Sequence, residues 1–515
     1  MSSIPPQRRY LENHADWRPE KTALRFADTN EVLTFGEFDE QANRFANALH
    51  DRGVRSGDRV GLFLFNTREF PIALYGCHKL NAIPVAANTQ LAADDLRYII
   101  DDMGTQLLIY DHEISDKLET AAAGAIGDHT MIGAGFTPEE GISFEAVVES
   151  GSPERPPSFE KSEQDPSYMF YTSGTTGNPK GVVHSVKSGR ERANSSIIEC
   201  GISTDSVSLA LLPWYHGAGI DITVRATVSV GAEIIVLKRP DVERSLEVIE
   251  EQEVSHVTSV PSLTQRFAEH DSIESRDLSS IEYFMHTGEV LTEKQAKLFR
   301  KQLTENIYNL YGSSEIGVST ALRPTDLPEH AGTVGRPCKG VEARVVEPGT
   351  GTETNPDNEV PVGTEGELIL RTDQVFPGYF ENHRATRQVV RDGWYYTNDM
   401  AVIDEDGYLT VTGRVDDMII SGGELIPPAE VEDAIESHDL VTSAVVVGHS
   451  DDEWGERVAA YVATRDGLSE TELDSYLKDN GKLADYKRPK EYNFVEEIPR
   501  TGAGKKQRAP FKKEE

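Results

Sequence analysis

Apolar residues early in the chain recur with the period of a helix that buries one face. They follow one another at three- and four-residue steps, at Phe38, Ala42, Phe45 and Leu49. Thr34 and Glu37 precede this run in the order of a capping box, and Gly53 follows it. The apolar pair Val32 and Leu33 comes just before the cap. The sequence therefore predicts a short strand and then a helix that starts after Thr34 and ends at Gly53.

Strand-like and helix-like segments continue to alternate as far as residue 110. Strands are predicted at 60–65, 83–86 and 106–110, and helices at 69–80 and 92–103. This alternation is typical of βαβ units and predicts a mostly parallel sheet. Residues 111–165 show little periodicity, and the Pro- and Gly-rich stretch at 151–157 is predicted to be a surface connection.

Five further short strands are predicted in the next part of the chain, at 207–212, 233–237, 256–260, 283–286 and 307–310. Several of them lead directly into turn residues with polar or aromatic side chains. Ligands of open α/β sheets bind beyond the carboxyl ends of the strands. These turns are therefore the candidate binding residues.

A loop rich in glycine and hydroxyl side chains follows the apolar residues 168–170. Between Thr172 and Gly181 it holds three glycines, four hydroxyl side chains and one lysine, Lys180. Glycine lets the main chain approach an anion closely, hydroxyls and backbone N–H groups donate hydrogen bonds, and a lysine adds positive charge. The spacing differs from G-x-x-x-x-G-K-[ST], because Lys180 comes three residues after Gly177. The loop predicts a nucleotide polyphosphate site, and a flexible linker is the alternative.

The charge balance bears on possible partners. The chain carries 51 basic and 87 acidic residues, and its net charge is −36. This excess argues against nucleic acid or an anionic membrane as a partner and requires a nucleotide site to be locally basic. It is consistent with a halophilic protein whose carboxylates are screened by concentrated salt, and an acidic mesophilic enzyme is the alternative.

Length and cysteine usage indicate the architecture and the compartment. A chain of 515 residues exceeds the size at which single cores stop growing, so two or more domains are expected. Cys77, Cys200 and Cys338 are widely spaced and odd in number, which favours reduced thiols in a cytoplasmic protein. The sequence shows neither a signal-like start nor an 18-residue apolar run, so no integral membrane segment is expected.

Six more segments carry polar residues in a fixed order along the chain, at 213–219, 286–289, 308–315, 394–399, 413–432 and 498–508. Together with the loop at 171–181 they resemble the adenylate-forming superfamily of acyl-CoA synthetases, peptide-synthetase adenylation domains and luciferases. The resemblance implies an α/β fold. A large N-terminal domain with mostly parallel βαβ sheets would span residues 1–413. A hinge would lie at 414–416 around Asp416, followed by a small mobile α+β domain at 417–515.

The resemblance also implies the roles of individual residues. Lys505, Thr175 and Glu315 are expected to be catalytic, with Glu315 also associated with Mg²⁺. ATP is expected to contact Thr172, Ser173, Gly174, Thr175, Thr176, Gly177, Lys180, Gly288, Glu289, Tyr311, Gly312, Ser314, Asp399 and Arg414. The acyl group and CoA are expected to contact His216, Gly217, His286, Gly422 and Gly423. The chain departs from the family pattern at Ser314, Asn398, Leu425 and Pro427, where Thr, Gly, Asn and Tyr are usual.

The activity implied by the resemblance is a two-step ligation. ATP would activate a carboxylic acid, fatty or aryl, to an acyl-adenylate with release of pyrophosphate, and CoA would then take the acyl group with release of AMP. One alternative is an enzyme that loads an amino or hydroxy acid onto a carrier protein. Another is a non-catalytic nucleotide-binding regulator, for which loss of Lys505 or Glu315 would be expected, although both are present. The sequence predicts neither the acid itself nor the oligomeric state.

Overall fold

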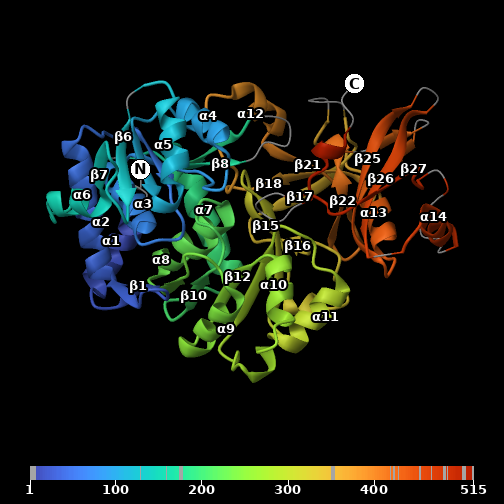
Figure 1. Ribbon diagram of the computed structural model, residues 1–515, viewed down its shortest axis with the longest axis horizontal. Coiled ribbons are helices and arrows are strands. Elements are labelled where there is room, and N and C mark those ends of the chain that lie inside the picture. Colours follow the sequence, from blue (N-terminus) through green and yellow to red (C-terminus); the bar gives the residue numbers. More distant parts are fainter. Residues whose placement is uncertain are drawn as a thin grey trace. The chain divides into compact units, whose positions relative to one another are not determined.

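The structure is a computed structural model (Figure 1). It describes residues 7–127, 129–157, 159, 161–172, 178–349, 354–417, 419–421, 424–426, 428–451, 454–465, 467–479, 483, 485, 487–500 and 506–512. Packing divides the chain into two compact units. Unit 1 is Met1–Glu342 with Arg371–Arg387, and unit 2 is Ala343–Leu370 with Gln388–Glu515. The predicted hinge at 414–416 and the domain bounds it sets are not tested by this division and stay a prediction.

The first sheet of unit 1 has nine strands in the order β16-β15-β14-β13-β12-β10-β11-β1-β2. Its strands are β1 (Thr22–Phe26), β2 (Glu31–Thr34), β10 (Val207–Ala210), β11 (Glu233–Val236), β12 (His256–Ser259), β13 (Tyr283–Thr287), β14 (Ile307–Ser313), β15 (Gly317–Leu322) and β16 (Arg336–Pro337). Strands β11, β10, β12, β13 and β14 are mutually parallel, so their carboxyl ends lie along one edge. The predicted parallel sheet and its five strands after residue 200 are confirmed.

The second sheet of unit 1 has eight strands in the order β19-β9-β8-β4-β3-β5-β6-β7. They are β3 (Arg59–Phe63), β4 (Ile83–Ala86), β5 (Leu107–Asp111), β6 (Thr130–Ala134), β7 (Gly141–Ser143), β8 (Pro166–Thr172), β9 (Lys180–Ser185) and β19 (Gly378–Tyr379). Strand β8 runs parallel to β4, whereas β9 turns back antiparallel to β8. Strand β19, nearly 200 residues later in the chain, completes the edge beside β9.

Helices of unit 1 bury their apolar faces against these sheets. They are α1 (Arg8–Trp17), α2 (Phe35–Asp51), α3 (Glu69–Leu80), α4 (Ala93–Met103), α5 (Ser115–Ala123), α6 (Phe144–Ser150), α7 (Val186–Glu199), α8 (Thr227–Val230), α9 (Val242–Glu251), α10 (Pro261–Ala268), α11 (Glu293–Gln302) and α12 (His383–Val389), whose last residues belong to unit 2. A π-helix, η2 (Gly219–Ala226), precedes α8, and short 3₁₀ turns occur at η1 (His112–Ile114), η3 (Ile273–Ser275) and η4 (Pro324–Asp326).

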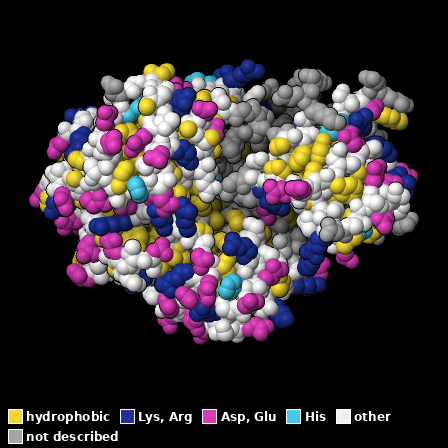
Figure 2. Space-filling model, viewed as in Figure 1, with side chains coloured by type: hydrophobic (Ala, Val, Ile, Leu, Met, Phe, Trp, Pro, Cys, Tyr) yellow, Lys and Arg dark blue, Asp and Glu magenta, His cyan; other side chains and the backbone are white. Residues whose placement is uncertain are grey.

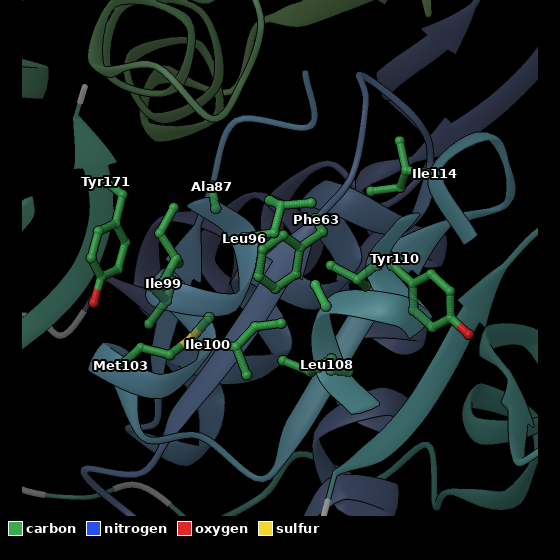
Figure 3. Packing of buried hydrophobic residues seen from close by; sticks show 14 of the residues in the cluster. Phe63, Ala87, Leu96, Ile99, Ile100, Met103, Leu108, Tyr110, Ile114 and Tyr171 are labelled. Carbon is green, nitrogen blue, oxygen red and sulfur yellow. The ribbon is translucent and has the colours of Figure 1, made fainter. Parts of the chain in front are cut away.

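The packing of α4 illustrates how pattern becomes core. Its residues Leu96, Ile99, Ile100 and Met103 recur at the helical period and are buried. Figure 3 shows them pointing toward Phe63 and its neighbours on the second sheet. The predicted capping box of α2 is also confirmed, because the Glu37 backbone N–H donates to Thr34 Oγ1 at 3.2 Å and the Thr34 N–H donates to Glu37 Oε2 at 2.9 Å.

Unit 2 contains two five-stranded sheets. The first holds β17 (Glu342–Val346), β18 (Gly366–Arg371), β20 (Val390–Arg391), β21 (Trp394–Ile403) and β22 (Leu409–Arg414). The second holds β23 (Ile419–Ser421), β24 (Glu424–Ile426), β25 (Val441–Asp451), β26 (Gly455–Thr464) and β27 (Glu491–Val495), with helices α13 (Pro428–Glu436) and α14 (Glu470–Asp479) and turns η5 (Val415–Asp417) and η6 (Ala509–Phe511). The α/β fold with mostly parallel sheets and a smaller C-terminal domain is therefore confirmed.

The surface reflects the charge of the chain. Acidic side chains spread over the face seen in Figure 2, with lysines and arginines interleaved among them. Within the part of the chain that the structure describes, helices long and apolar enough to span a bilayer do not occur.

Candidate active site

The predicted phosphate loop is the tip of a β-hairpin. Strand β8 ends at Thr172, strand β9 begins at Lys180, and these two residues are paired across the antiparallel ladder. The hairpin therefore closes the base of the loop and places Thr172 and Lys180 side by side. Ser173, Gly174, Thr175, Thr176 and Gly177 lie outside the described residues.

Lys180 and Glu315 meet around one aromatic ring. The Lys180 ammonium lies 5.3 Å from the centre of the Tyr379 ring, a cation–π distance. The hydroxyl of the same tyrosine donates to Glu315 Oε1 at 2.8 Å. Two oppositely charged groups that are 135 positions apart in sequence are thus gathered at one point of unit 1.

The candidate adenine residues lie at the carboxyl edge of the first sheet. Thr287 at the end of β13 pairs with Leu310 on β14, so Gly288 and Tyr311 are adjacent along that edge. Gly288 has φ +95°, a conformation that side chains disfavour, and a Cβ there would have Val260 Cγ1 as its nearest atom, at 4.0 Å. Gly288 therefore has open space at the position of a Cβ, and Glu289 and Tyr311 are half-buried.

The turn that carries Ser314 and Glu315 is tightly built. A Cβ at Gly312 would collide with the carbonyl oxygen of Gly317, so only glycine allows β14 and β15 to approach so closely. The Glu315 carbonyl accepts the Phe376 N–H at 2.8 Å, and the Ser313 hydroxyl accepts the Glu315 N–H at 3.2 Å. Glu315 is consequently fixed through both its backbone and its carboxylate.

Sequence reasoning missed Arg192, a buried arginine of α7 beside this turn. Its Nη1 donates to the Ser314 carbonyl at 3.2 Å, and its Nε pairs with Asp221 Oδ2 at 2.6 Å. The two side chains are 3% and 5% exposed. No signal in the linear sequence indicates it, because its partners Asp221 and Ser314 lie 29 and 122 positions away.

Asp221 is the centre of the polar network behind the acyl-site candidates. Its Oδ1 accepts the Tyr168 hydroxyl at 2.6 Å and lies 3.5 Å from Arg225 Nε. Burial raises the pKa of Tyr168, and the Asp221 charge raises it further, so the phenol remains a neutral donor. Tyr168 can therefore donate its hydroxyl hydrogen to Asp221 near neutral pH.

His216 and Gly217 follow β10 at the same carboxyl edge. His216 is half-buried, and its backbone N–H donates to the Pro213 carbonyl at 3.1 Å. A Cβ at Gly217 would lie 3.2 Å from both Arg192 Nη2 and Phe170 Cζ, so the glycine leaves room for the guanidinium. The turn is therefore packed directly against the network around Asp221.

His286 lies inside the core rather than at the edge. The imidazole is fully buried, with Nε2 2.9 Å from Thr264 Oγ1 and ring centres at 5.4 Å from Phe284 and 5.2 Å from Phe299. Burial lowers the pKa of His286 to about 3, so the ring is neutral at physiological pH. Its predicted contact with the acyl group or CoA stays a prediction, and its observed partners belong to the protein.

Unit 2 brings Asp399 and Arg414 together. They pair across β21 and β22, and Arg414 Nη1 donates to Asp399 Oδ1 at 2.8 Å. Arg414 also donates to the Thr397 carbonyl at 3.3 Å. A carboxylate accepts hydrogen bonds from hydroxyl groups, so Asp399 has the chemistry that a contact with ribose hydroxyls requires.

The remaining predicted residues are only partly described. Gly422, Gly423, Lys505 and the side chain of Asp416 lie outside the described residues. Arg500 and Lys506, which lie on either side of the segment that contains Lys505, form an isolated antiparallel β-bridge. Lys506 Nζ lies 2.7 Å from Glu436 Oε1, so an ion pair connects this bridge to α13.

Few of the described side chains could act as ligands of a metal ion. Among the side chains that the structure describes, no group of three or more His, Cys, Asp or Glu is placed to hold a metal ion. A single carboxylate, Glu315, fits a Mg²⁺ that arrives with the phosphate oxygens of a nucleotide, because Mg²⁺ keeps several non-protein oxygen ligands.

Comparisons with known proteins cover nearly the whole chain. The family model of the AMP-binding enzyme matches residues 11–380, and that of the AMP-binding enzyme C-terminal domain matches residues 430–505. The chain is 30% identical over 497 residues to the indoleacetate–CoA ligase of Aromatoleum aromaticum, covering 96% of this chain and 95% of that protein. It is 31% identical over 502 residues to the long-chain-fatty-acid–CoA ligase FadD13 of Mycobacterium tuberculosis, covering 96% and 95%.

Solved structures give the same result. ATP-bound MatB from Rhodopseudomonas palustris superposes with a TM-score of 0.88 at 25% identity, covering 98% of both chains. The anthranilate CoA ligase AuaEII in complex with anthranoyl-AMP superposes with a TM-score of 0.87 at 26% identity, covering 99% of this chain and 97% of that chain.

Proposed function

Because this chain belongs to the AMP-binding enzyme family, it is an AMP-forming acid–thiol ligase, and we propose that its acid is a fatty or an aryl acid. It activates a carboxylic acid with ATP to an acyl-adenylate and transfers the acyl group to CoA. The observation that carries the site assignment is the hairpin loop closed between Thr172 and Lys180, with Lys180 and Glu315 gathered around Tyr379.

The first half-reaction is displacement at phosphorus. A carboxylate oxygen of the acid attacks the α-phosphorus of ATP, a new O–P bond forms, and the bond from this phosphorus to the pyrophosphate oxygen breaks. Such transfers need positioning and stabilisation of charge on the phosphate oxygens. We assign this work to the hydroxyls and N–H groups of residues 172–177, to Lys180, to the hydroxyl of Ser314 and to Lys505. Bound Mg²⁺, held by Glu315, would neutralise charge on the phosphates.

Other residues are assigned to the binding of the nucleoside and of the CoA thiol. Gly288, Glu289, Tyr311 and Gly312 would form the adenine wall, and Asp399 and Arg414 would hold the ribose. In the second half-reaction the CoA thiolate attacks the acyl carbon and AMP leaves with the bonding electrons. A thiol of pKa about 8.5 is sufficiently ionised near neutral pH for this step. Gly422 and Gly423 would admit the pantetheine arm, and rotation about Asp416 would exchange the two halves.

The proposed acid class rests on the relatives. One printed name specifies an indole acid and another a long-chain fatty acid, and the residues behind His216 and Gly217 do not select between them. We also propose a cytoplasmic location, a role in fatty or aryl acid metabolism and adaptation to high salt. For the domain organisation, we propose an N-terminal domain at 1–413, a hinge at 414–416 and a C-terminal domain at 417–515.

The test is pyrophosphate release with Mg·ATP over short, medium, long and aryl acids, with and without CoA. We expect CoA-dependent turnover on one acid class. Acid-dependent ATP–pyrophosphate exchange without thioester would instead favour a carrier-loading enzyme. Failure of every acid to support turnover would contradict the ligase.

Lys505→Ala should reduce adenylation about 100-fold or more, because a charge that stabilises the transition state is lost. Lys506→Ala is the matched control, since it removes the neighbouring lysine that pairs with Glu436. Equal effects of the two substitutions on pyrophosphate release would show that Lys505 has no special part in the chemistry.

A further inference from the structure

Tyr379 is the residue through which two candidate ATP-site groups are connected. Its hydroxyl donates to Glu315 Oε1 at 2.8 Å, and its ring lies under the Lys180 ammonium at 5.3 Å from the ring centre. The contacts show that this tyrosine touches both a cation and a carboxylate.

Hydrogen bonds fix the backbone around Tyr379 to the neighbouring strand β9. Strand β19 pairs with β9, with Tyr379 opposite Val182, and the Phe380 N–H donates to the Gly181 carbonyl at 2.8 Å. The Tyr379 N–H donates to Thr386 Oγ1 at 3.0 Å. The ring is therefore fixed to the strand whose first residue is Lys180.

The same segment also holds the other side of the site. The Phe376 N–H donates to the Glu315 carbonyl at 2.8 Å, and the Phe376 ring packs edge-on against Tyr379 with ring centres 4.9 Å apart. Residues 376–380 therefore form a bracket that ties the turn at Glu315 to the base of the phosphate loop.

We propose that Tyr379 is a positioning residue for the binding of Mg·ATP. Its hydroxyl occupies Glu315 Oε1 and orients the carboxylate so that Oε2 is left for the cation, and its ring steers the Lys180 ammonium toward the phosphates. A flexible glutamate and a flexible lysine would otherwise lose side-chain entropy when the nucleotide binds. This inference rests on the proposed ATP-dependent function.

A tyrosine that served only to fill space would be replaceable by phenylalanine. Tyr379→Phe removes the hydroxyl and keeps the ring under Lys180, whereas Tyr379→Leu removes both contacts. Tyr110→Phe is the matched control, because Tyr110 donates to Glu119 Oε1 at 2.7 Å from β5, four strands away from β9 in the same sheet. Both Phe variants lose one tyrosine–carboxylate hydrogen bond, but only one of them lies at the site.

The primary measurement is calorimetric binding of Mg·ATP to the full chain without any acid. We expect Kd to rise about tenfold for Tyr379→Phe and further for Tyr379→Leu, with Tyr110→Phe within about twofold of the wild type. In the Glu315→Gln background, Tyr379→Phe should change Kd less than about twofold, because the carboxylate it orients is gone. In turnover assays KM for ATP should rise while KM for the acid stays constant.

Two results would overturn the inference. One is equal Mg·ATP affinity for Tyr379→Phe and Tyr110→Phe, and the other is a full additional loss in the Glu315→Gln background. Failure of the proposed function is distinguishable, because it would appear as a wild type without turnover on any acid. The binding measurement decides the role of Tyr379 in either case.

Discussion

At the scale of single residues, the groups that hold the candidate site come from distant parts of the sequence. Lys180 and Glu315 are recognisable from their motifs, because the spacing of glycines, hydroxyls and charges is local. Arg192 and the role of Tyr379 are not recognisable, because each depends on contacts between elements that the linear pattern does not specify. Arg192 is also the clearest case in which one buried charge supports several elements at once.

Arg192→Met should destabilise the protein by about 3 kcal/mol. It leaves Asp221 buried with only Tyr168 and the more distant Arg225, and breaking a buried pair from one side costs about 3–5 kcal/mol. Urea unfolding measures the loss. Arg190→Met is the control on the same helix, since its pairs with Glu163 and Glu191 are more exposed and surface pairs contribute about 1 kcal/mol or less. Equal losses would contradict the role assigned to Arg192.

His286 gives a pH dependence of stability. The pKa of this buried imidazole is about 3 in the folded chain, compared with about 6.5 when unfolded. Between these values the unfolded chain binds the extra proton, so the free energy of unfolding falls as the pH decreases. His286→Gln should reduce this slope by about 1.4 kcal/mol per pH unit between about pH 6 and pH 4. Calorimetric unfolding across that range tests it, and identical slopes would show that the histidine is protonated in the folded state.

At the scale of elements, agreement between pattern and structure depends on segment length. Helix α3 and strand β4 are predicted at their observed bounds, because each is a largely apolar run that turn residues separate from its neighbours. Residues 111–165 show no clear pattern, yet they contain α5, β6, β7 and α6. Strand β7 and helix α6 are only three and seven residues long, which is too short for a period to emerge. Their places are set by packing on neighbouring elements.

The β14–β15 hairpin supports a prediction about an element. Gly312→Ala should abolish Mg·ATP binding, because its Cβ would collide with the Gly317 carbonyl and force the turn that carries Ser314 and Glu315 to open. Ser313→Ala is the control in the next position, since it removes the hydroxyl that accepts the Glu315 N–H and adds no bulk beside the Gly317 carbonyl. Binding calorimetry distinguishes the two, and normal affinity for Gly312→Ala would show that the turn can relax without loss of function.

At the scale of the whole molecule, net charge dominates the solution behaviour. With a charge of −36, repulsion among carboxylates opposes the compact state, and dissolved salt screens it. We expect Tm to be higher in molar KCl than in millimolar KCl. A scanning calorimetry series at constant pH measures this, with an equal-osmolarity sucrose series to separate screening from solute exclusion. A Tm independent of KCl would indicate an ordinary acidic protein.

The division of the chain into interleaved units has a consequence for synthesis. Residues 371–387 belong to unit 1, although residues 343–370, which belong to unit 2, precede them. Strand β19 therefore reaches its place beside β9 only after nearly 200 further residues have been translated. A nascent chain that has already paired β8 with β9 still lacks Tyr379 and Phe376. The bracket around Glu315 and Lys180 is thus among the last parts of unit 1 to form on the ribosome, and a fragment that ends near residue 342 would emerge with its phosphate loop unsupported.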